Sequence, residues 1–191
     1  MNKNRLEAFS DGVIAIIITI MVLEMKVPHS SDFDDLKKLL PVFISYILSY
    51  VYVGIYWNNH HHLFHIAQKI NGKILWSNLH LLFWLSLFPF VTGYVGETHF
   101  SDLSVMLYGI VLFMAGFAYF ILVKALISRH GKESKIAQAI GKDIKGLISI
   151  VIYAIAICLS FYNSIIAFAL YVIVACIWFI PDKRIEHIIN D

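Results

Sequence analysis

The sequence predicts an all-α integral membrane protein, a single six-helix transmembrane domain that covers residues 1–191. The first observation is composition: the chain is 59% hydrophobic and 15% charged, with a mean hydropathy of +0.74, whereas soluble domains are roughly 45–50% apolar. The second is a succession of apolar segments separated by short polar connectors. The third is the lack of any polar stretch long enough for a soluble catalytic domain, so we expect no enzymatic activity.

Six apolar segments are predicted to cross the membrane as helices, which takes roughly 20 residues each. They cover about 6–26, 39–57, 74–95, 103–127, 146–161 and 164–181. An even number of crossings places both termini on one side. All basic residues except Lys26, Lys37 and Lys38 then share that side. By the positive-inside rule we expect a multi-pass cell-membrane protein with cytoplasmic termini.

The first segment carries a stripe of side chains on one helical face. At 100° per residue, Ile16, Thr19, Ile20 and Leu23 fall close together in azimuth, and Asp11 falls on the opposite side. If the stripe faces a symmetry axis, its apolar members become stacked hydrophobic rings that line a pore. A buried central helix explains the same stripe, and periodicity alone does not separate the two interpretations.

Asp11 needs a partner, because an ionisable group inside a membrane segment is costly and is normally paired. We predict a polar network that fixes the first helix against its neighbours. Its members are Arg5, Ser10, Asp11, Asn78 and His80. Trp57 and the run His60 to His62 lie at a suitable depth as well. In the alternative interpretation, Arg5 snorkels to the headgroups and Asp11 caps the helix there.

The later segments divide into polar and apolar ones. The second segment is rich in Ser and Tyr, so we expect it to face other helices. In the third, Pro89 is expected to interrupt the outer half of the helix. The last three are expected to form a lipid-facing scaffold, with a tight turn at Asn163-Ser164. The basic connector 128–145 has room for a short amphipathic helix at the membrane surface.

Two patterns suggest other functions. His61 and His65 have the i, i+4 spacing of metal ligands, but no third ligand is visible, so an interfacial role is favoured over metal binding or pH sensing. The segment 92–96 reads TGYVG, which has the residue types of the potassium filter TVGYG in another order. Because carbonyl geometry depends on that order, we expect no such filter.

The first segment opens with Arg5-x-x-x-Phe9-Ser10-Asp11-Gly12 and continues with Ala15-Ile16-x-x-Thr19 and Val22-Leu23 before Pro28. Further matches are Trp57 with His60-His61, Asn78-Leu79, Pro89-Phe90 and Thr92. With these residues the chain resembles the transmembrane protein 175 family of potassium channels, in its prokaryotic single-repeat form. The last three segments match only in number and hydrophobicity.

The resemblance implies a six-helix subunit without a re-entrant loop, which assembles as a homotetramer around its first helices. It implies that Ile16, Thr19 and Leu23 face the pore beside Ile20, with the apolar rings as constriction. It also implies that Arg5, Phe9, Ser10 and Asp11 hold the first helix against the second and third. The expected partners are further copies of the chain, membrane lipid and permeant potassium ions. No cofactor, metal or nucleic acid is expected.

Two functions of other classes compete with a potassium-permeable channel gated by hydrophobic rings. A proton-coupled secondary transporter would titrate Asp11 and His80, although no inverted repeat or broken-helix pair is visible. A membrane enzyme or haem protein would need a nucleophile, or paired histidines on facing helices, and neither is apparent.

Overall fold

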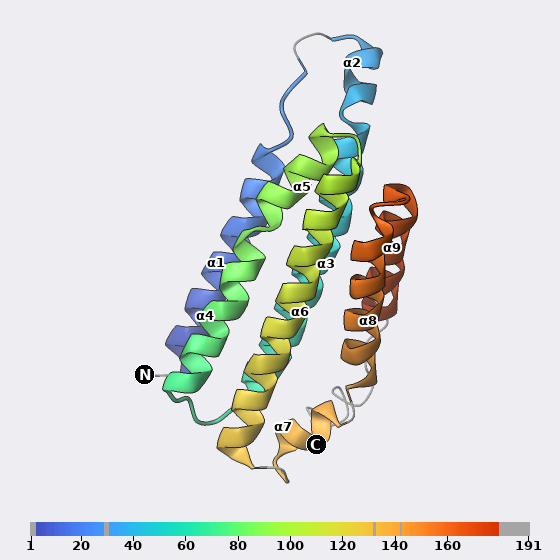
Figure 1. The fold of residues 1–191 in the computed structure, drawn as a ribbon. Helices are drawn as coiled ribbons and strands as arrows, with labels where there is room; N and C mark the ends of the chain where they lie inside the picture. The colour runs from blue at the N-terminus through green and yellow to red at the C-terminus, as the bar shows by residue number, and fades with distance from the viewer. Residues whose placement is uncertain (1–2, 29–30, 132, 142, 180–191) are drawn as a thin grey trace.

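The computed structural model describes residues 3–28, 31–131, 133–141 and 143–179, and all regular secondary structure in these ranges is helical (Figure 1). The helices are α1 Lys3–Leu23, α2 Phe33–Lys38, α3 Leu40–Ile66, α4 Gly72–Ser86, α5 Phe88–Glu97, α6 Asp102–His130, α7 Lys135–Ile140, α8 Ile144–Leu159 and α9 Ser164–Phe179. The last two residues of the predicted segment 164–181 lie outside the described residues.

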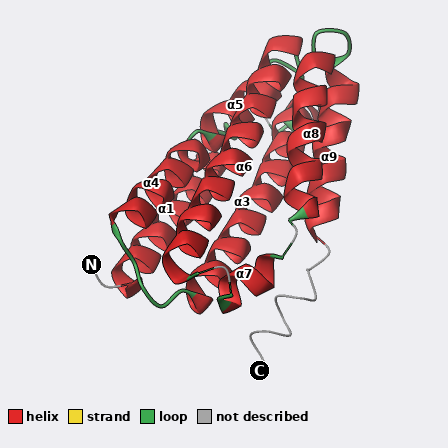
Figure 2. Ribbon diagram, turned by 60° about the horizontal axis from the view of Figure 1, so that its bottom comes forward, coloured by secondary structure: helices red, strands yellow, loops and turns green. Residues whose placement is uncertain are grey.

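The long helices run roughly parallel to one another in an elongated bundle (Figure 1). α3 and α6 occupy the middle, α1 and α4 lie on one side, and the α8–α9 pair lies on the other (Figures 1 and 2). The start of α1, the end of α6 and helix α7 lie at one end of the bundle, which we call the basic end after Lys3, Arg5 and Arg129. We call the opposite end, which carries α2 and its aspartates, the acidic end.

Within the described residues, four helical stretches are long and apolar enough to cross a membrane: α1, α3, α6 and the joined stretch Gly72–Glu97. α8 and α9 are apolar but have 16 residues each. At 1.5 Å per residue they are about 24 Å long, which is shorter than the hydrocarbon core of roughly 30 Å. The protein is therefore a helical membrane protein in which four long helices are accompanied by a shorter hairpin.

The predicted end of the second segment at Trp57 is wrong, because α3 continues to Ile66. The run Asn58 to His62 is polar, as is typical of a segment at the membrane–water interface. The helix nevertheless continues through it, with one face packed against other helices. His60 and Phe64 are fully buried on that face. Packing thus extends the helix nine residues past its apolar sequence.

The third segment is interrupted as expected, between α4 and α5 at Leu87. Pro89 lies in the first turn of α5, where its missing N–H costs little. The polar connector between the first two segments, which carries Asp32, Asp34 and Asp35, contains the short helix α2. In the basic connector, α7 is the short helix for which the sequence left room.

Buried hydroxyl groups join the middle helices near the acidic end. Thr92 Oγ1 donates to Ser49 Oγ at 2.6 Å, and Ser49 Oγ lies 2.9 Å from the hydroxyl of Tyr108. Ser45 Oγ donates to the Thr92 carbonyl at 3.0 Å. These contacts link α3, α5 and α6, as expected for the Ser- and Tyr-rich second segment. Each hydroxyl in the set has a partner, which a buried polar group requires.

A glycine allows α6 and α9 to approach closely. A Cβ added at Gly109 would overlap the hydroxyl of Tyr171 and would lie 2.9 Å from Ile157 Cγ1. The same hydroxyl donates to the carbonyl of Val105 at 3.3 Å. The α8–α9 hairpin therefore packs against α6 because this position has no side chain.

Candidate pore-lining helix

Helix α1 has one packed face and one open face. The packed face carries Leu6, Ser10, Ile14, Ile17 and Met21, all of which are buried. The four stripe residues lie on the open face, with exposed fractions of 58% for Ile16, 41% for Ile20 and 77% for Leu23, and Thr19 exposed between them. Ile16 and Ile20 border an open groove against Phe90 of α5, and the stripe as a whole stays exposed in the described part of the chain.

Thr19 is positioned by its own helix. Its Oγ1 donates to the carbonyl of Ile16 at 2.9 Å, which is the usual i−3 bond of a helical threonine. The hydroxyl proton is thereby used, and the oxygen lone pairs of Thr19 remain on the open face. Thr19 can therefore offer an acceptor, flanked by the apolar side chains of Ile16 and Leu23.

A directed chain of hydrogen bonds fixes the packed face of α1 to α4 and α3. Ser10 Oγ donates to the Leu6 carbonyl at 2.9 Å and accepts from Asn78 Nδ2 at 2.9 Å. Asn78 Oδ1 lies 2.8 Å from His60 Nε2. Because an amide oxygen only accepts, His60 must carry its proton on Nε2. All three side chains are fully buried.

His60 Nδ1 is buried without a hydrogen-bond partner among the described residues. The ring packs on Phe64, with centroids 4.5 Å apart. The tautomer set by Asn78 leaves this nitrogen as a bare acceptor, and an unpaired buried acceptor costs roughly 1–3 kcal/mol. The hydrogen bonds from Ser10 through Asn78 to His60 therefore join α1, α4 and α3, and they leave His60 Nδ1 without a partner among the described residues.

Asp11 binds to α3 through a tryptophan. Trp57 Nε1 donates to Asp11 Oδ1 at 3.1 Å. The Trp57 ring stacks on His61 with centroids 6.0 Å apart, and His61 Nδ1 lies 3.5 Å from Glu7 Oε1. Two acidic side chains of α1 thus contact consecutive turns of α3.

The structure brings together Ser10 and Asn78 of the predicted network, and it places the other members elsewhere. Phe9 is 53% exposed, and Arg5 is exposed without a hydrogen bond or ion pair among the described residues. His80 accepts from Trp84 Nε1 at 3.0 Å on its own helix. No contact joins His80 to Asp11 among the described residues.

Sequence reasoning left two contributors out of the network. The predicted second helix ended at Trp57, so the sequence predicted only that Trp57 and His60 lie at the same membrane depth as Asp11. A helix continued to Ile66 puts both on the side that meets α1 and α4. The spacing Trp57, His60, Phe64 at i, i+3, i+7 was the available signal.

At the acidic end, the segment that follows α1 is bound to α5 by an exposed ion pair. Lys26 Nζ lies 2.6 Å from Glu97 Oε1. The hydrogen bond to Glu97 and its negative charge raise the pKa of Lys26 above the ordinary value. An exposed pair of this kind contributes little to stability. Towards the acidic end, α1 is thus held mainly by the apolar packing of Ile17 and Met21, whereas near the basic end it is also held by buried hydrogen bonds.

The region around the histidines holds no metal centre in the described part of the chain, since no group of three His, Cys, Asp or Glu side chains is placed to bind one. His61 and His65 do lie near each other, with ring centroids 6.1 Å apart. Their other close contacts are aromatic rings and Glu7.

The comparisons with known proteins agree on one family. The family described as "Endosomal/lysosomal potassium channel TMEM175" matches residues 5–89. A protein of Chryseobacterium sp. (strain P1-3) named as a potassium channel is 54% identical over 191 residues, which cover 100% of both chains. A protein of Bos taurus named "Endosomal/lysosomal proton channel TMEM175" is 34% identical over 96 residues, which cover 44% of this chain and 20% of that protein.

The fold also has a solved relative, a crystal structure titled a lysosomal potassium-selective channel TMEM175 homolog from Chamaesiphon minutus. The match has a TM-score of 0.79 and 26% identity, and it covers 92% of this chain and 95% of that one. Relatives named as channels confirm the expectation that the chain is not an enzyme. The full-length identity, the fold and the matched residues of α1 to α5 together show that this chain belongs to the TMEM175 family.

Proposed function

We propose that the protein is a potassium-permeable cation channel, a homotetramer whose four α1 helices line the pore. The observation that carries the proposal is the division of α1 into a packed face and an open face. The open face holds the apolar side chains of Ile16, Ile20 and Leu23, which are 58%, 41% and 77% exposed in the single chain. The names of the relatives favour potassium as the permeant ion.

In the proposed pore, Ile16, Ile20 and Leu23 form hydrophobic rings, and Thr19 forms the polar ring among them. A narrow apolar ring expels water, so an ion that would lose its hydration does not cross; slight widening lets a hydrated or partly hydrated ion through. The acceptor oxygen of Thr19 can replace part of the hydration shell of a cation. The constriction thus serves as the gate.

The proposed channel has no TVGYG filter. Residues 92–96 lie within helix α5, and Thr92 is buried there in hydrogen bonds to α3. A potassium filter instead needs an extended segment whose carbonyl groups point at the ion. In the proposed channel, the rings of α1 side chains are therefore the part that selects among cations.

The proposed role of Arg5, Phe9, Ser10, Asp11, Asn78 and His80 is to position α1, not to conduct. Ser10, Asn78 and Asp11 act within the subunit through the contacts given above. Arg5 and Phe9 are exposed in the single chain, so their proposed partners are neighbouring subunits. His80 orients Trp84 on α4.

We further propose that α8 and α9 also cross the membrane, which gives six spans and cytoplasmic termini in the cell membrane. Asn163 Oδ1 accepts from Ile166 N at 3.0 Å and caps α9 at the turn. The apolar hairpin so formed can cross by local thinning of the bilayer. The basic residues gathered at one end of the bundle favour that end as cytoplasmic.

The test is current through purified protein in a planar bilayer, with potassium on one side and sodium on the other. We expect a reversal potential displaced towards the potassium equilibrium potential. Reversal near zero would mean a non-selective pore, and lack of current above protein-free bilayers would refute the channel.

A proton conductance is the second candidate, because the bovine relative is named a proton channel. In the same bilayers, a pH gradient with symmetric potassium should leave the reversal potential near zero if potassium carries the current. A displacement that follows the proton gradient would favour proton permeation. Flux that saturates and is coupled to the gradient would instead favour the transporter that uses Asp11 and His80.

A further inference from the structure

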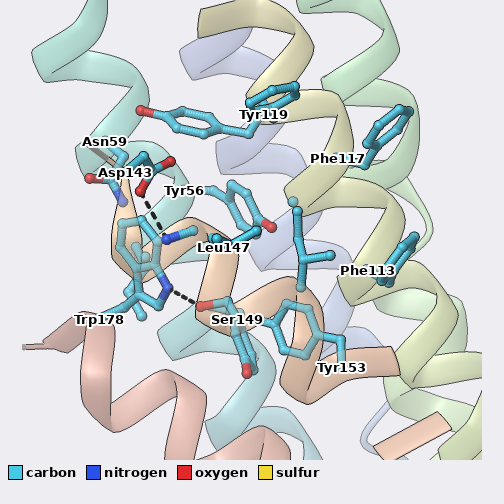
Figure 3. A pocket seen from close by; sticks show the side chains of 16 residues that line it. Tyr56, Asn59, Phe113, Phe117, Tyr119, Asp143, Leu147, Ser149, Tyr153 and Trp178 are labelled. Carbon is cyan, nitrogen blue, oxygen red and sulfur yellow. Dashed lines mark hydrogen bonds between the residues drawn. The ribbon is translucent and has the colours of Figure 1, made fainter. Parts of the chain in front are cut away.

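A cavity of about 370 Å³ lies on the side of the bundle away from α1. Ligand sites in proteins usually measure roughly 300–1,000 Å³. The cavity is bounded by α3, α6 and α8, with one residue from α9 (Figure 3). It is lined by Tyr52, Ile55, Tyr56, Asn59, Phe113, Gly116, Phe117, Tyr119, Phe120, Asp143, Gly146, Leu147, Ser149, Ile150, Tyr153 and Trp178.

Two polar side chains of the cavity lie together, Asn59 near the end of α3 and Asp143, which caps α8, whereas Phe113 and Tyr153 lie away from them (Figure 3). Asn59 and Asp143 belong to the basic end of the bundle, next to α7. The rest of the wall is mainly aromatic and aliphatic, and its serine, Ser149, accepts a hydrogen bond from Trp178. The occupant that fits is therefore amphipathic, with its apolar part inside and its polar part at the basic end.

The cavity borders the outside of the bundle between α6 and α8. Leu147 is 66% exposed, and Phe117 and Phe120 are each 42% exposed. In a membrane protein this face contacts lipid, so the apolar group available to fill the cavity is a lipid acyl chain. A methylene group takes about the volume of a liquid water molecule, roughly 30 Å³, so the cavity holds on the order of a dozen methylenes.

Two lysines adjoin residues of the cavity wall. Lys124 Nζ lies 5.2 Å from the ring centroid of Phe120, a wall residue. Lys145 precedes the wall residue Gly146 in the first turn of α8. The charge of Asp143 is partly used within the protein, since its Oδ1 accepts from Gly146 N at 2.8 Å. The excess of cations matches a phosphate group.

The hydroxyl groups of two tyrosines, Tyr56 and Tyr119, also line the cavity. Neither Tyr56 nor Tyr119 donates a hydrogen bond from its hydroxyl to any described residue. Gly116 leaves space there, because a Cβ at this position would come only within 3.7 Å of the Tyr56 hydroxyl. Phenol donors in the cavity wall fit the ester carbonyl oxygens of a glycerolipid.

We propose that this cavity binds one acyl chain of an anionic phospholipid, with the phosphate held by Lys124 and Lys145 and the ester region by the two tyrosine hydroxyls. The site is independent of the proposed conductance. It lies on the opposite side of the bundle from α1, so a lipid can occupy it whether or not α1 lines a pore.

The test is native mass spectrometry of delipidated protein in detergent, titrated with palmitoyl-oleoyl phosphatidylglycerol or with the matching phosphatidylcholine. We expect tighter binding of the anionic lipid. Gly116→Leu fills the cavity and should abolish that binding, whereas Ala154→Leu adds similar bulk on the exposed outer face of α8 and should not. Size-exclusion profiles verify that both variants fold.

A charge variant tests the headgroup without altering the cavity. Lys124→Gln should weaken phosphatidylglycerol binding about fivefold, the factor expected for one basic residue near an anionic headgroup. Lys73→Gln, an exposed change on α4 at the same end, should leave it unchanged. Undiminished binding by Gly116→Leu, or equal binding of the two lipids, would overturn the proposal.

Discussion

At the scale of residues, the open face of α1 determines what the chain can conduct. Ile16→Asn places an amide in the proposed hydrophobic constriction, and Leu23→Ala widens it. Both changes should hydrate the constriction and raise ion leak several-fold, with weaker discrimination between potassium and sodium. Single-channel recording in bi-ionic bilayers measures both quantities.

Matched controls separate pore residues from other exposed apolar residues. Ile155→Asn on α8 alters a side chain that is 53% exposed, compared with 58% for Ile16, and Ile165→Ala on α9 alters one that is 61% exposed. Neither control should change conduction. Wild-type current in both α1 variants would show that α1 does not line the pore.

Asn78 is the residue on which the anchoring of α1 depends most. Asn78→Leu keeps the branching and the number of side-chain heavy atoms but removes both hydrogen bonds, which leaves Ser10 Oγ and His60 Nε2 without those partners. Each unsatisfied buried group costs roughly 1–3 kcal/mol. Each kcal/mol lowers Tm by about 2–4 °C in a protein of this size.

Thermal unfolding in detergent, followed by size exclusion, measures that shift. Ser77→Ala is the control, because Ser77 bonds only to the carbonyl of Lys73 one turn earlier. Equal Tm values for Asn78→Leu and the wild type would mean that the chain from Ser10 to His60 does not stabilise α1.

The sequence predicted that Ser10 and Asn78 belong to one group, because buried polar side chains need partners. It did not predict the pairing of Asp11 with Trp57, nor that His80 bonds to Trp84 on its own helix. Polarity identifies which side chains need a partner. The choice among partners at similar depth depends on helix rotation and lateral position, which the pattern of one helix does not contain.

At the scale of elements, Gly109 tests how the α8–α9 hairpin is held. Gly109→Ala should destabilise the protein by about 1–3 kcal/mol through overlap with Tyr171 and Ile157. Gly116→Ala, two turns later on α6, meets only an ordinary contact and should be neutral or stabilising by up to about 1 kcal/mol. Unfolding in urea compares the two, and equal stabilities would contradict close packing at Gly109.

The elements themselves were largely predictable. The starts and ends of α1, α6 and α8 and the start of α9 lie within about three residues of the predicted segments, because apolar runs and polar connectors alternate clearly there. α3 was predicted too short at its end, since the buried face of its last turns is set by contacts with α1 and α4 and not by overall hydropathy. The sequence does not predict α2, because a helix of six residues has too few turns to show a helical period of apolar residues.

At the scale of the whole molecule, the proposed tetramer brings four copies of Leu23 close to one axis. In a background with Cys158 and Cys176 replaced by Ser, Leu23→Cys should be joined between subunits by a short bifunctional thiol reagent. Ile165→Cys, on the far side of the bundle, should not be. Denaturing gels after treatment in membranes should show dimers for the first variant alone, and no cross-linking there would argue against a shared axis.

The uneven attachment of α1 has a mechanical consequence. Ser10 accepts a buried hydrogen bond from Asn78, whereas the other end of the helix has the apolar packing of Met21 and an exposed ion pair just beyond it; we propose that the helix tilts about a point near Ser10. At 1.5 Å per residue, Ile16 lies about 9 Å and Leu23 about 20 Å from that point. A tilt of about 5° therefore displaces Ile16 by about 0.8 Å but Leu23 by about 1.7 Å. In the proposed pore, the same small rotation would therefore open the ring of Leu23 about twice as far as the ring of Ile16.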